Sequence, residues 1–454
     1  MSKEVEILLG EPKKAILKLS VPIIIGMLVQ TVYNLADGIW LAGISSNALA
    51  AIGLFFPFFM VIMALGSGIG AGGGSAISRK IGAGLKKDAE NTALHTFAIA
   101  TIISILLYLL IFPFIGEIFN RLSGNGEVGK MSVDYARILF GGSIFIILVN
   151  AGGSVLRGEG NAKKAMFGLI FGAGLNILLD PIFIYVFGWG VSGAALATLI
   201  AYIGSFILFW YWLFFKKNIY LDLSLKNFNF DKNIIKEILW VGIPSALTRV
   251  SMAVSMIFLN MIIIVIGSTN GIAIFVSGWN IVMFGTIPLM GISTGVTSVT
   301  GAAFGAEDKN KLKTAYMYAI KISILIELVI AYIIFIFAPS LAKMFSYSEG
   351  SAGIYDDLVN FLRIIPLFCL TVPLGMLTSA MFRGIGRGVS SLIVTLLRTF
   401  VFQLFIVYLL AIILGWGLTG VWWGIVIGNI LAVGITFAWG ILTINRLVIH
   451  NKGR

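Results

Sequence analysis

Three carboxylates, Asp37, Asp180 and Glu327, lie deep inside apolar stretches of this chain. A charged side chain at the centre of a bilayer costs roughly 2.5–3.5 kcal/mol on insertion scales. Such residues are therefore rare, and they usually face a cavity or a polar partner along an ion or substrate path. We expect Asp37 and Asp180 to form a buried site for a cation or a proton.

Each of the two aspartates follows an asparagine by one helical turn. Asn34 and Asp37 are spaced i, i+3, and Asn176 and Asp180 are spaced i, i+4, so each pair shares one helix face. Thr198 lies on the next predicted helix, at a depth similar to that of Asp180. Carboxylate, amide and hydroxyl oxygens suit a small hard cation such as Na⁺, whereas two close carboxylates can instead share a proton. A network that only pins two helices together is the alternative interpretation.

The composition indicates a membrane protein. Apolar residues make up 59% of the 454 residues and charged residues 11%, whereas soluble domains contain about 25% charged residues. Twelve apolar stretches are long enough to cross a bilayer as helices. We therefore predict an all-α integral membrane protein with 12 transmembrane helices.

The basic residues are distributed very unevenly between the two sides of the predicted helices. Of the 32 Lys and Arg, 24 lie at the termini or in loops after even-numbered stretches, and three lie in loops after odd-numbered stretches. Because cytoplasmic loops carry the excess of Lys and Arg, we expect both termini to be cytoplasmic and the protein to lie in the plasma membrane. The net charge of +12 then reflects topology, and we expect no nucleic-acid partner.

The chain contains two copies of one six-helix unit. Leu156–Gly160 resembles Phe382–Gly386, and the Gly-Trp-Gly stretch Gly188–Gly193 resembles Gly415–Gly420. Copies with six spans each run in the same direction through the membrane, so we expect two six-helix bundles related by a pseudo-two-fold axis along the membrane normal. The predicted parts are an N-terminal lobe at residues 1–215, a linker at 216–233 and a C-terminal lobe at 234–454.

Two further features concern the packing of these lobes. The linker is polar and basic, and its apolar residues alternate enough for it to lie along the cytoplasmic membrane surface. The run Gly66–Gly74 places small residues at four-residue spacing, which favours close contact between membrane helices.

The second half lacks the aspartates of the first half. The positions equivalent to Asp37 and Asp180 are Leu259 and Val407, so we expect the ion chemistry mostly in the N-terminal lobe. Glu327 either forms a structural ion pair, with Arg363 or Arg398 as partner, or serves as a secondary proton or substrate site. The sequence alone leaves both interpretations open.

Proline and methionine residues suggest a bending helix and a pliable cavity. Pro22 and Pro244 lie inside the first helix of each copy, where proline frees a carbonyl and bends the helix. The Pro22 bend falls about four turns before Asp37, although a static packing kink is an equal alternative. Methionines of the seventh and eighth stretches, Met256 among them, either line an adaptable apolar cavity or pack against lipid and core.

Several kinds of chemistry are unsupported. Gly124–Lys130 nearly spells a P-loop, but Met131 follows where a Ser or Thr would bind Mg²⁺, and no strand precedes it. The single Cys369 and only two histidines make a Cys- or His-based metal site implausible. We find no catalytic triad, and we expect no enzyme activity, no nucleotide and no cofactor beyond a coupling ion, Na⁺ or H⁺.

The chain resembles the multidrug and toxic compound extrusion (MATE) transporters, and within them the prokaryotic DinF-like branch. The resemblance rests on the stretch Gln30–Asp37, the repeated Arg-Gly-X-Gly turns, and Asn176, Asp180 and Thr198 at their spacing. It covers nearly the whole chain and implies a V-shaped pair of six-helix bundles.

The resemblance also implies roles for individual residues. It places cation binding, with Na⁺ as one candidate, at Asp37, Asn176, Asp180 and Thr198, and it makes Pro22 the bending point of the first helix. The polar groups that it assigns to the substrate cavity are Tyr33, Tyr135 and Asn150.

From these features we predict a secondary active multidrug antiporter. It would export organic cations or other xenobiotics in exchange for Na⁺ or H⁺ by alternating access. We expect it to be a monomer whose partners are amphipathic or cationic small molecules and membrane lipids. The alternative is a flippase for lipids or lipid-linked oligosaccharides, which usually needs a strongly basic cavity, and here only Arg249 and Arg398 are plausible cavity cations.

Overall fold

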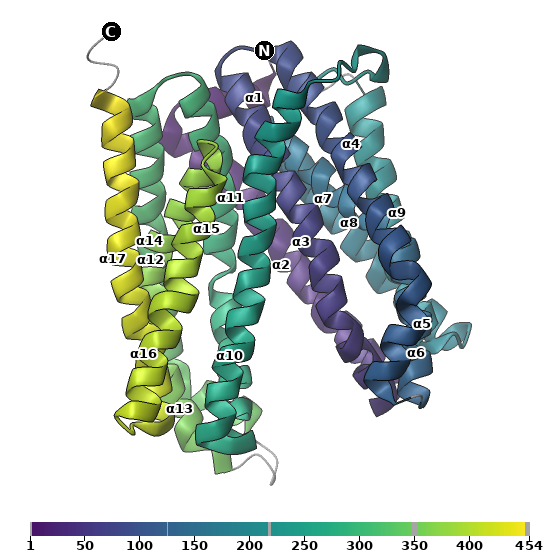
Figure 1. Cartoon of the computed structure of the whole chain (residues 1–454), viewed down its shortest axis with the longest axis vertical. Coiled ribbons are helices and arrows are strands. Elements are labelled where there is room, and N and C mark those ends of the chain that lie inside the picture. The colour runs from purple at the N-terminus through teal and green to yellow at the C-terminus, as the bar shows by residue number, and fades with distance from the viewer. Residues whose placement is uncertain (1, 125, 217–218, 347–352, 450–454) are drawn as a thin grey trace. The chain divides into compact units, whose positions relative to one another are not determined.

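The computed structural model describes residues 2–124, 126–216, 219–346 and 353–449. Every regular element in these residues is helical (Figure 1), which confirms the predicted all-α fold. The chain packs as two compact units. Unit 1 contains Met1–Gly10 and Val21–Ala246, and unit 2 contains Glu11–Ser20 and Leu247–Arg454.

Unit 1 is a bundle of long helices joined by short turns. Side-chain caps mark several starts, as where the hydroxyl of Ser45 accepts a hydrogen bond from the backbone N–H of Ala48 at 3.1 Å. The elements are α1 (Lys3–Leu9), most of α2 (Pro12–Ala42), α3 (Ser46–Gly82), α4 (Lys86–Ile111), η1 (Phe112–Phe114), α5 (Ile115–Ser123), α6 (Glu127–Gly141), α7 (Ser143–Gly158), α8 (Ala162–Pro181), η2 (Ile182–Val186), α9 (Gly190–Trp210), η3 (Tyr211–Phe215), η4 (Leu225–Asn227) and the start of α10.

Unit 2 repeats this pattern of long helices. Its first helix is broken at Ser268, where φ is 51°, so that α10 contains two successive helices. The elements are α10 (Lys232–Gly285), α11 (Ile287–Gly305), α12 (Lys309–Phe345), α13 (Tyr355–Ile364), α14 (Pro366–Gly384), α15 (Gly388–Leu396), η6 (Leu397–Leu404), α16 (Phe405–Tyr408), η7 (Leu409–Ile413) and α17 (Gly417–Ile449).

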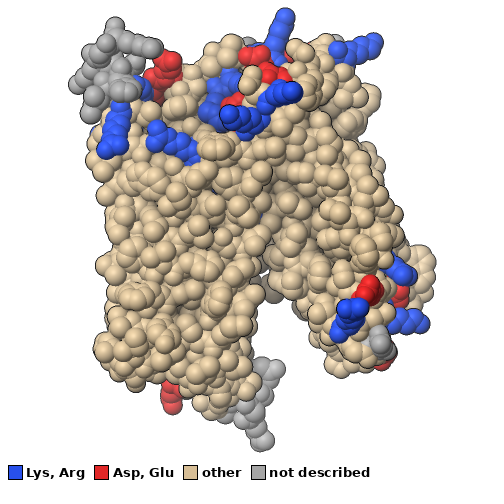
Figure 2. Space-filling view, viewed as in Figure 1, with Lys and Arg blue, Asp and Glu red and all other residues tan. Residues whose placement is uncertain are grey.

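The helices have the length and composition of membrane spans. Within the described residues, 11 helices are long and apolar enough to cross a bilayer, and the pair α6–α7, bent by 49°, makes up to 12. In Figure 2 charged side chains gather toward the ends of the helices, and the surface between them is almost free of charge. The chain is therefore a multi-pass membrane protein, as predicted.

Wide π-helical turns follow α8 and α9, and they recur in η6 and η7. Pro181 lacks the N–H that would continue the α-helical ladder of α8. The chain continues through η2, which ends with the N–H of Phe187 donating to the carbonyl of Ile182 at 2.9 Å. Turns of this kind are rare and often lie at functional sites, and η2 begins two residues after Asp180.

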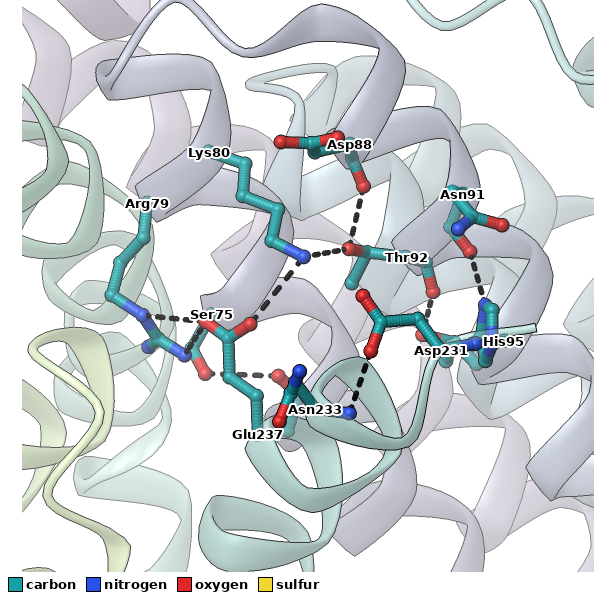
Figure 3. Close-up of polar contacts among 12 residues, drawn as sticks. Ser75, Arg79, Lys80, Asp88, Asn91, Thr92, His95, Asp231, Asn233 and Glu237 are labelled. Atoms are coloured by element: carbon teal, nitrogen blue, oxygen red, sulfur yellow. Dashed lines mark hydrogen bonds and ion pairs between the residues drawn. The ribbon is translucent and has the colours of Figure 1, made fainter. Parts of the chain in front are cut away.

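Close glycine packing joins α3 to the beginning of α10, as the glycine run predicted. A Cβ at Gly68 would lie 2.7 Å from the carbonyl oxygen of Gly242, and one at Gly72 would overlap the carbonyl oxygen of Ile238. The guanidinium of Arg79 also pairs with Glu237 at 2.9 Å (Figure 3). Unit 1 therefore extends to Ala246, beyond the predicted lobe boundaries at 215 and 234.

The start of α2 packs in unit 2, just as the start of α10 packs in unit 1. Residues Glu11–Ser20 belong to unit 2, where a Cβ at Gly295 of α11 would lie 2.6 Å from the hydroxyl of Ser20. The helix passes into unit 1 at Val21, next to Pro22. The first residues of α2 thus belong to unit 2, and the first residues of α10 belong to unit 1. Hydropathy alone does not predict this pattern.

The linker packs on unit 1. Leu221 and Leu223 are 1% and 3% exposed, and the backbone N–H of Leu221 donates to the carboxyl of Glu159 at 3.3 Å. Further along, the N–H of Asp231 donates to Nε2 of His95 at 3.0 Å (Figure 3). The linker, which we predicted to lie along the membrane surface, is thus docked on unit 1 through its backbone.

Candidate functional site

A buried polar group in unit 1 contains three of the predicted site residues. Asn176 and Asp180 are 2% and 0% exposed on α8, and Thr198 is 5% exposed on α9. In the orientation that satisfies both ends of its amide, Asn176 donates to the Asp180 carboxylate at 2.9 Å and accepts from the Thr198 hydroxyl at 3.2 Å. Asp180 and Thr198, which we predicted to lie at similar depth, are therefore connected by the side chain of Asn176.

Asp37, on α2, is the fourth predicted residue of this group. Its carboxyl group lies within hydrogen-bonding reach of the Asp180 carboxyl group. The side chain is half-buried, and its Oδ1 atom has no partner among the described residues. Two carboxyl groups from neighbouring helices thus face each other inside the membrane-spanning part of unit 1.

Tyrosine side chains lie near the two aspartates. Tyr33, one turn before Asp37 on α2, lies within electrostatic range of Asp37, Asp180, Tyr135 and Tyr202. Tyr135 is 6% exposed. The predicted cavity residues Tyr33 and Tyr135 therefore belong to the surroundings of the carboxyl pair.

Sequence reasoning missed two residues in these surroundings, Met63 and Tyr202. The amide of Asn150 donates to the Met63 sulfur at 3.7 Å, and the Tyr202 hydroxyl lies 3.9 Å from the same sulfur. Tyr202 is four residues after Thr198, so it shares the helix face that the polar pattern had already identified. That spacing was the available signal, whereas nothing in the sequence around Met63 distinguishes it from core methionines.

The arrangement can hold a proton or a small cation. No ion pair among the described residues involves Asp37 or Asp180, so two ionised carboxylates would repel each other without compensation. A shared proton removes that repulsion, and a bound cation does the same. For a cation, the Asn176 amide can turn so that its oxygen, rather than its nitrogen, faces Asp180.

Two other predicted residues of α2 have a less direct relation to the pair. Asn34 is exposed, with no hydrogen bond found for it within the described ranges, so its role in cation binding stays a prediction. Pro22 is buried inside α2, which continues as one helix from Pro12 to Ala42. Bending at Pro22 likewise stays a prediction.

Met256 lies in unit 2, half-buried on α10. The next turns of α10 line an apolar groove of about 550 Å³ with η6, α16 and η7. Met256 itself is outside this groove, whereas Met261 is part of it. The role of Met256 in a substrate cavity stays a prediction.

Glu327 does not form the ion pair that the sequence suggested. It is fully buried on α12, and both carboxyl oxygens lack a partner among the described residues, as does Nη1 of Arg398. Glu327 lies within electrostatic range of Cys369 on α14, whereas Nη1 of Arg398 lies against a later turn of the same helix, 3.8 Å from the Cβ position of Gly375. The alternative role as a secondary proton or substrate site stays a prediction.

Comparison with known proteins places this geometry in a family. A family model described as MatE matches residues 22–182 and 244–409, which is most of the chain. The chain belongs to the MatE family. The two matched segments of this MatE protein correspond to the two sequence copies, and the first contains Asp37, Asn176 and Asp180.

Relatives of this MatE protein cover nearly its whole length. The multidrug export protein MepA of Staphylococcus haemolyticus (strain JCSC1435) is 28% identical over 424 residues, 92% of this chain and 90% of that one. A multidrug resistance MATE family transporter of the MOP superfamily, solved in the outward-facing conformation, is 48% identical, with a TM-score of 0.95. The match covers 98% of this chain and 99% of that chain. A MATE in the bent conformation is 46% identical, with a TM-score of 0.94 and 99% coverage of both chains. The resemblance seen in the sequence is thereby confirmed.

Proposed function

We propose that this MatE protein exports amphipathic or cationic small molecules across the plasma membrane in exchange for Na⁺ or H⁺. The observation that carries the proposal is the pair of facing carboxyl groups, Asp37 and Asp180, with no basic partner among the described residues. A buried carboxyl pair of this kind holds a proton or a small cation more favourably than it holds two bare charges.

The names of the relatives support the substrate class. MepA is a multidrug export protein, and a solved relative at 48% identity is a multidrug resistance transporter. These names favour multidrug export over the flippase alternative. In this proposal the protein works as a monomer among membrane lipids with both termini in the cytoplasm, and it uses no nucleotide and no cofactor other than its coupling ion.

The exchange follows from competition for the carboxyl pair. When a proton or Na⁺ occupies Asp37 and Asp180, the negative charge of the pair falls by one unit, and an organic cation is held less strongly. When the ion leaves, the pair regains charge and attracts the next substrate. A ligand can shift the transporter between states only to the extent that it binds one state more tightly, so this competition would couple the two fluxes.

The test is efflux of a fluorescent organic cation from proteoliposomes. An imposed Na⁺ gradient and an imposed pH gradient are applied separately to wild type and to Asp37→Asn, which keeps the side-chain size but removes the charge. Transport driven by one gradient in wild type and lost in Asp37→Asn is the expected result, and it would name the coupling ion. Equal transport by wild type and variant would contradict the assigned role of Asp37, and no response of wild type to either gradient would contradict antiport.

A further inference from the structure

The C-terminal end of α2 is fastened to unit 1 by a second contact, one turn beyond Asp37. The hydroxyl of Tyr185, in η2, donates a hydrogen bond to the backbone carbonyl of Trp40 at 2.5 Å. The two aromatic rings also meet edge to face, with centroids 6.2 Å apart and an interplanar angle of 71°. The same two elements, α2 and the continuation of α8, thus meet at Asp37–Asp180 and again at Trp40–Tyr185.

The local backbone is shaped for this contact. Trp40 lies in the last turn of α2, where carbonyl groups lack the N–H partners of the helix interior, and its oxygen also accepts from the N–H of Gly43 at 3.2 Å. A Cβ on Gly43 would overlap the Tyr185 hydroxyl. The glycine at the end of α2 therefore leaves the space through which the tyrosine reaches the carbonyl.

The last turn of α2 depends on such contacts. Gly38 directly follows Asp37, has open space around it, and weakens the helix at this point because glycine has the largest backbone freedom. Leu35 and Ile39 are 53% and 69% exposed, so this face of α2 is not covered by unit 1. The opposite face, with Asp37 and Trp40, is the one that unit 1 holds.

We propose that Tyr185 is a positioning residue for the cation site, because it keeps the last turn of α2 in register with η2 and thereby holds the Asp37 carboxyl against Asp180. This inference rests on the proposed exchange function. Asp37 and Trp40 are three residues apart, about 4.5 Å along the helix, so movement at one contact is transmitted to the other. A conformation in which the end of α2 leaves unit 1 would break both contacts together.

The test compares Tyr185→Phe, which removes only the hydroxyl, with wild type. A hydrogen bond of ordinary strength corresponds to a change of about 2- to 10-fold in an equilibrium constant. We expect Tyr185→Phe to weaken the apparent affinity for the coupling ion by about that factor, while the maximal efflux rate at saturating ion stays close to wild type. Gly43→Ala, which displaces the tyrosine hydroxyl by a different route, is expected to produce the same shift.

Tyr211→Phe is the matched control. Tyr211 lies in the other π-helical turn of unit 1 and is 49% exposed, against 45% for Tyr185. It is expected to leave the ion dependence unchanged. A shift of the same size in Tyr211→Phe would show that loss of any such hydroxyl is sufficient, and it would overturn the proposal.

A structural readout separates positioning from a general loss of activity. Spin labels at Ile39→Cys on α2 and Ile102→Cys on α4, in a Cys369→Ser background, report the position of the end of α2 within unit 1. The distance distribution is expected to broaden in Tyr185→Phe. Unchanged ion affinity and an unchanged distribution, in a wild type that shows ion-driven efflux, would overturn the role of Tyr185 alone. Absence of ion-driven efflux in wild type would instead contradict the proposed function.

Discussion

At the scale of single residues, Asn176 connects a carboxylate on its own helix to the hydroxyl of Thr198 on the next helix. All three side chains are buried, and the amide oxygen of Asn176 accepts from both the hydroxyl and the backbone N–H of Thr198, each at 3.2 Å. Removal of the hydroxyl therefore takes away one of two donors, and the loss of one hydrogen bond costs about 0.5–1.5 kcal/mol. The polar group therefore contributes to stability as well as to the proposed ion chemistry.

Thr198→Val is expected to lower the free energy of unfolding by about 0.5–1.5 kcal/mol, measured as thermal unfolding in detergent. The control is Thr101→Val on α4, because the Thr101 hydroxyl donates only to the Phe97 carbonyl of its own helix, at 2.9 Å. Equal destabilisation by the two substitutions would contradict the network around Asn176.

Glu159 gives the chain a pH-dependent contact outside its membrane-spanning helices. Burial raises the pKa of the Glu159 carboxyl to about 7, and the hydrogen bond from the Leu221 N–H opposes that rise only in part. Because this pKa is raised in the folded state, protonation of the Glu159 carboxyl favours folding. The contribution of the protonated carboxyl to stability is fully present below the ordinary pKa near 4.5 and is lost as the pH rises through about 7. The complete loss amounts to about 3 kcal/mol.

The expected result is that wild type loses thermal stability between pH 5.5 and 8.5 relative to Glu159→Gln. Glutamine keeps an oxygen that accepts from Leu221 but has no charge to bury, so the difference between the two proteins isolates the titration. Parallel stability curves over this range would contradict a raised pKa for Glu159.

The sequence predicted Asn176, Asp180 and Thr198 together because helical spacing determines which side chains share a face. It did not predict Tyr202 or Met63, since a tyrosine and a methionine in apolar helices have the composition of ordinary core. It also allowed an ion pair for Glu327 that is absent, because helix rotation and the register between helices depend on packing against α14. Spacing along one helix and the depth of polar residues in the membrane were predictable, whereas the rotation of each helix about its axis was not.

At the scale of elements, the contact between α3 and the beginning of α10 depends on glycine. In α3, a Cβ at Gly72 would overlap the backbone of Ile238, whereas Gly53 has open space around it. Both glycines lie inside the same helix, so an alanine at either position gains the same helix propensity. They differ only in the neighbouring backbone.

Gly72→Ala is expected to destabilise the protein by about 1–3 kcal/mol, because the two helices must separate to admit the methyl group. Gly53→Ala is expected to stabilise it by about 0.5–1 kcal/mol. Thermal unfolding of the two purified variants checks both values. Stabilisation by Gly72→Ala would mean that α10 does not approach α3 so closely.

The hydropathy pattern predicted the long helices, and the repeat predicted their grouping. It did not predict that the starts of α2 and α10 exchange units, because such packing depends on small residues meeting across distant parts of the chain. The docked linker was missed for a related reason, since its hydrogen bonds to Glu159 and His95 use backbone N–H groups that every residue carries.

At the scale of the whole molecule, the distribution of basic residues predicts the orientation in the membrane. Lys226 lies in the linker, which the positive-inside pattern places in the cytoplasm. Leu122, 55% exposed near the end of α5, belongs to a loop that the same pattern places outside. The two positions therefore report opposite sides of the membrane.

In a Cys369→Ser background, Leu122→Cys is expected to react with an impermeant thiol reagent in intact cells. Lys226→Cys is expected to react only after the membrane is permeabilised. The reverse pattern of labelling would invert the topology and move both termini outside.

The account as a whole depends on competition between substrate and ion at Asp37 and Asp180. The most direct measurement is the affinity of the purified protein for a fluorescent organic cation, titrated against Na⁺ at constant pH and against pH at constant Na⁺. We predict that wild type binds the dye more weakly as one of these ions increases, and that Asp37→Asn binds it with an affinity that neither ion changes. A wild-type affinity independent of both ions, or an Asp37→Asn variant that responds as wild type does, would contradict the account.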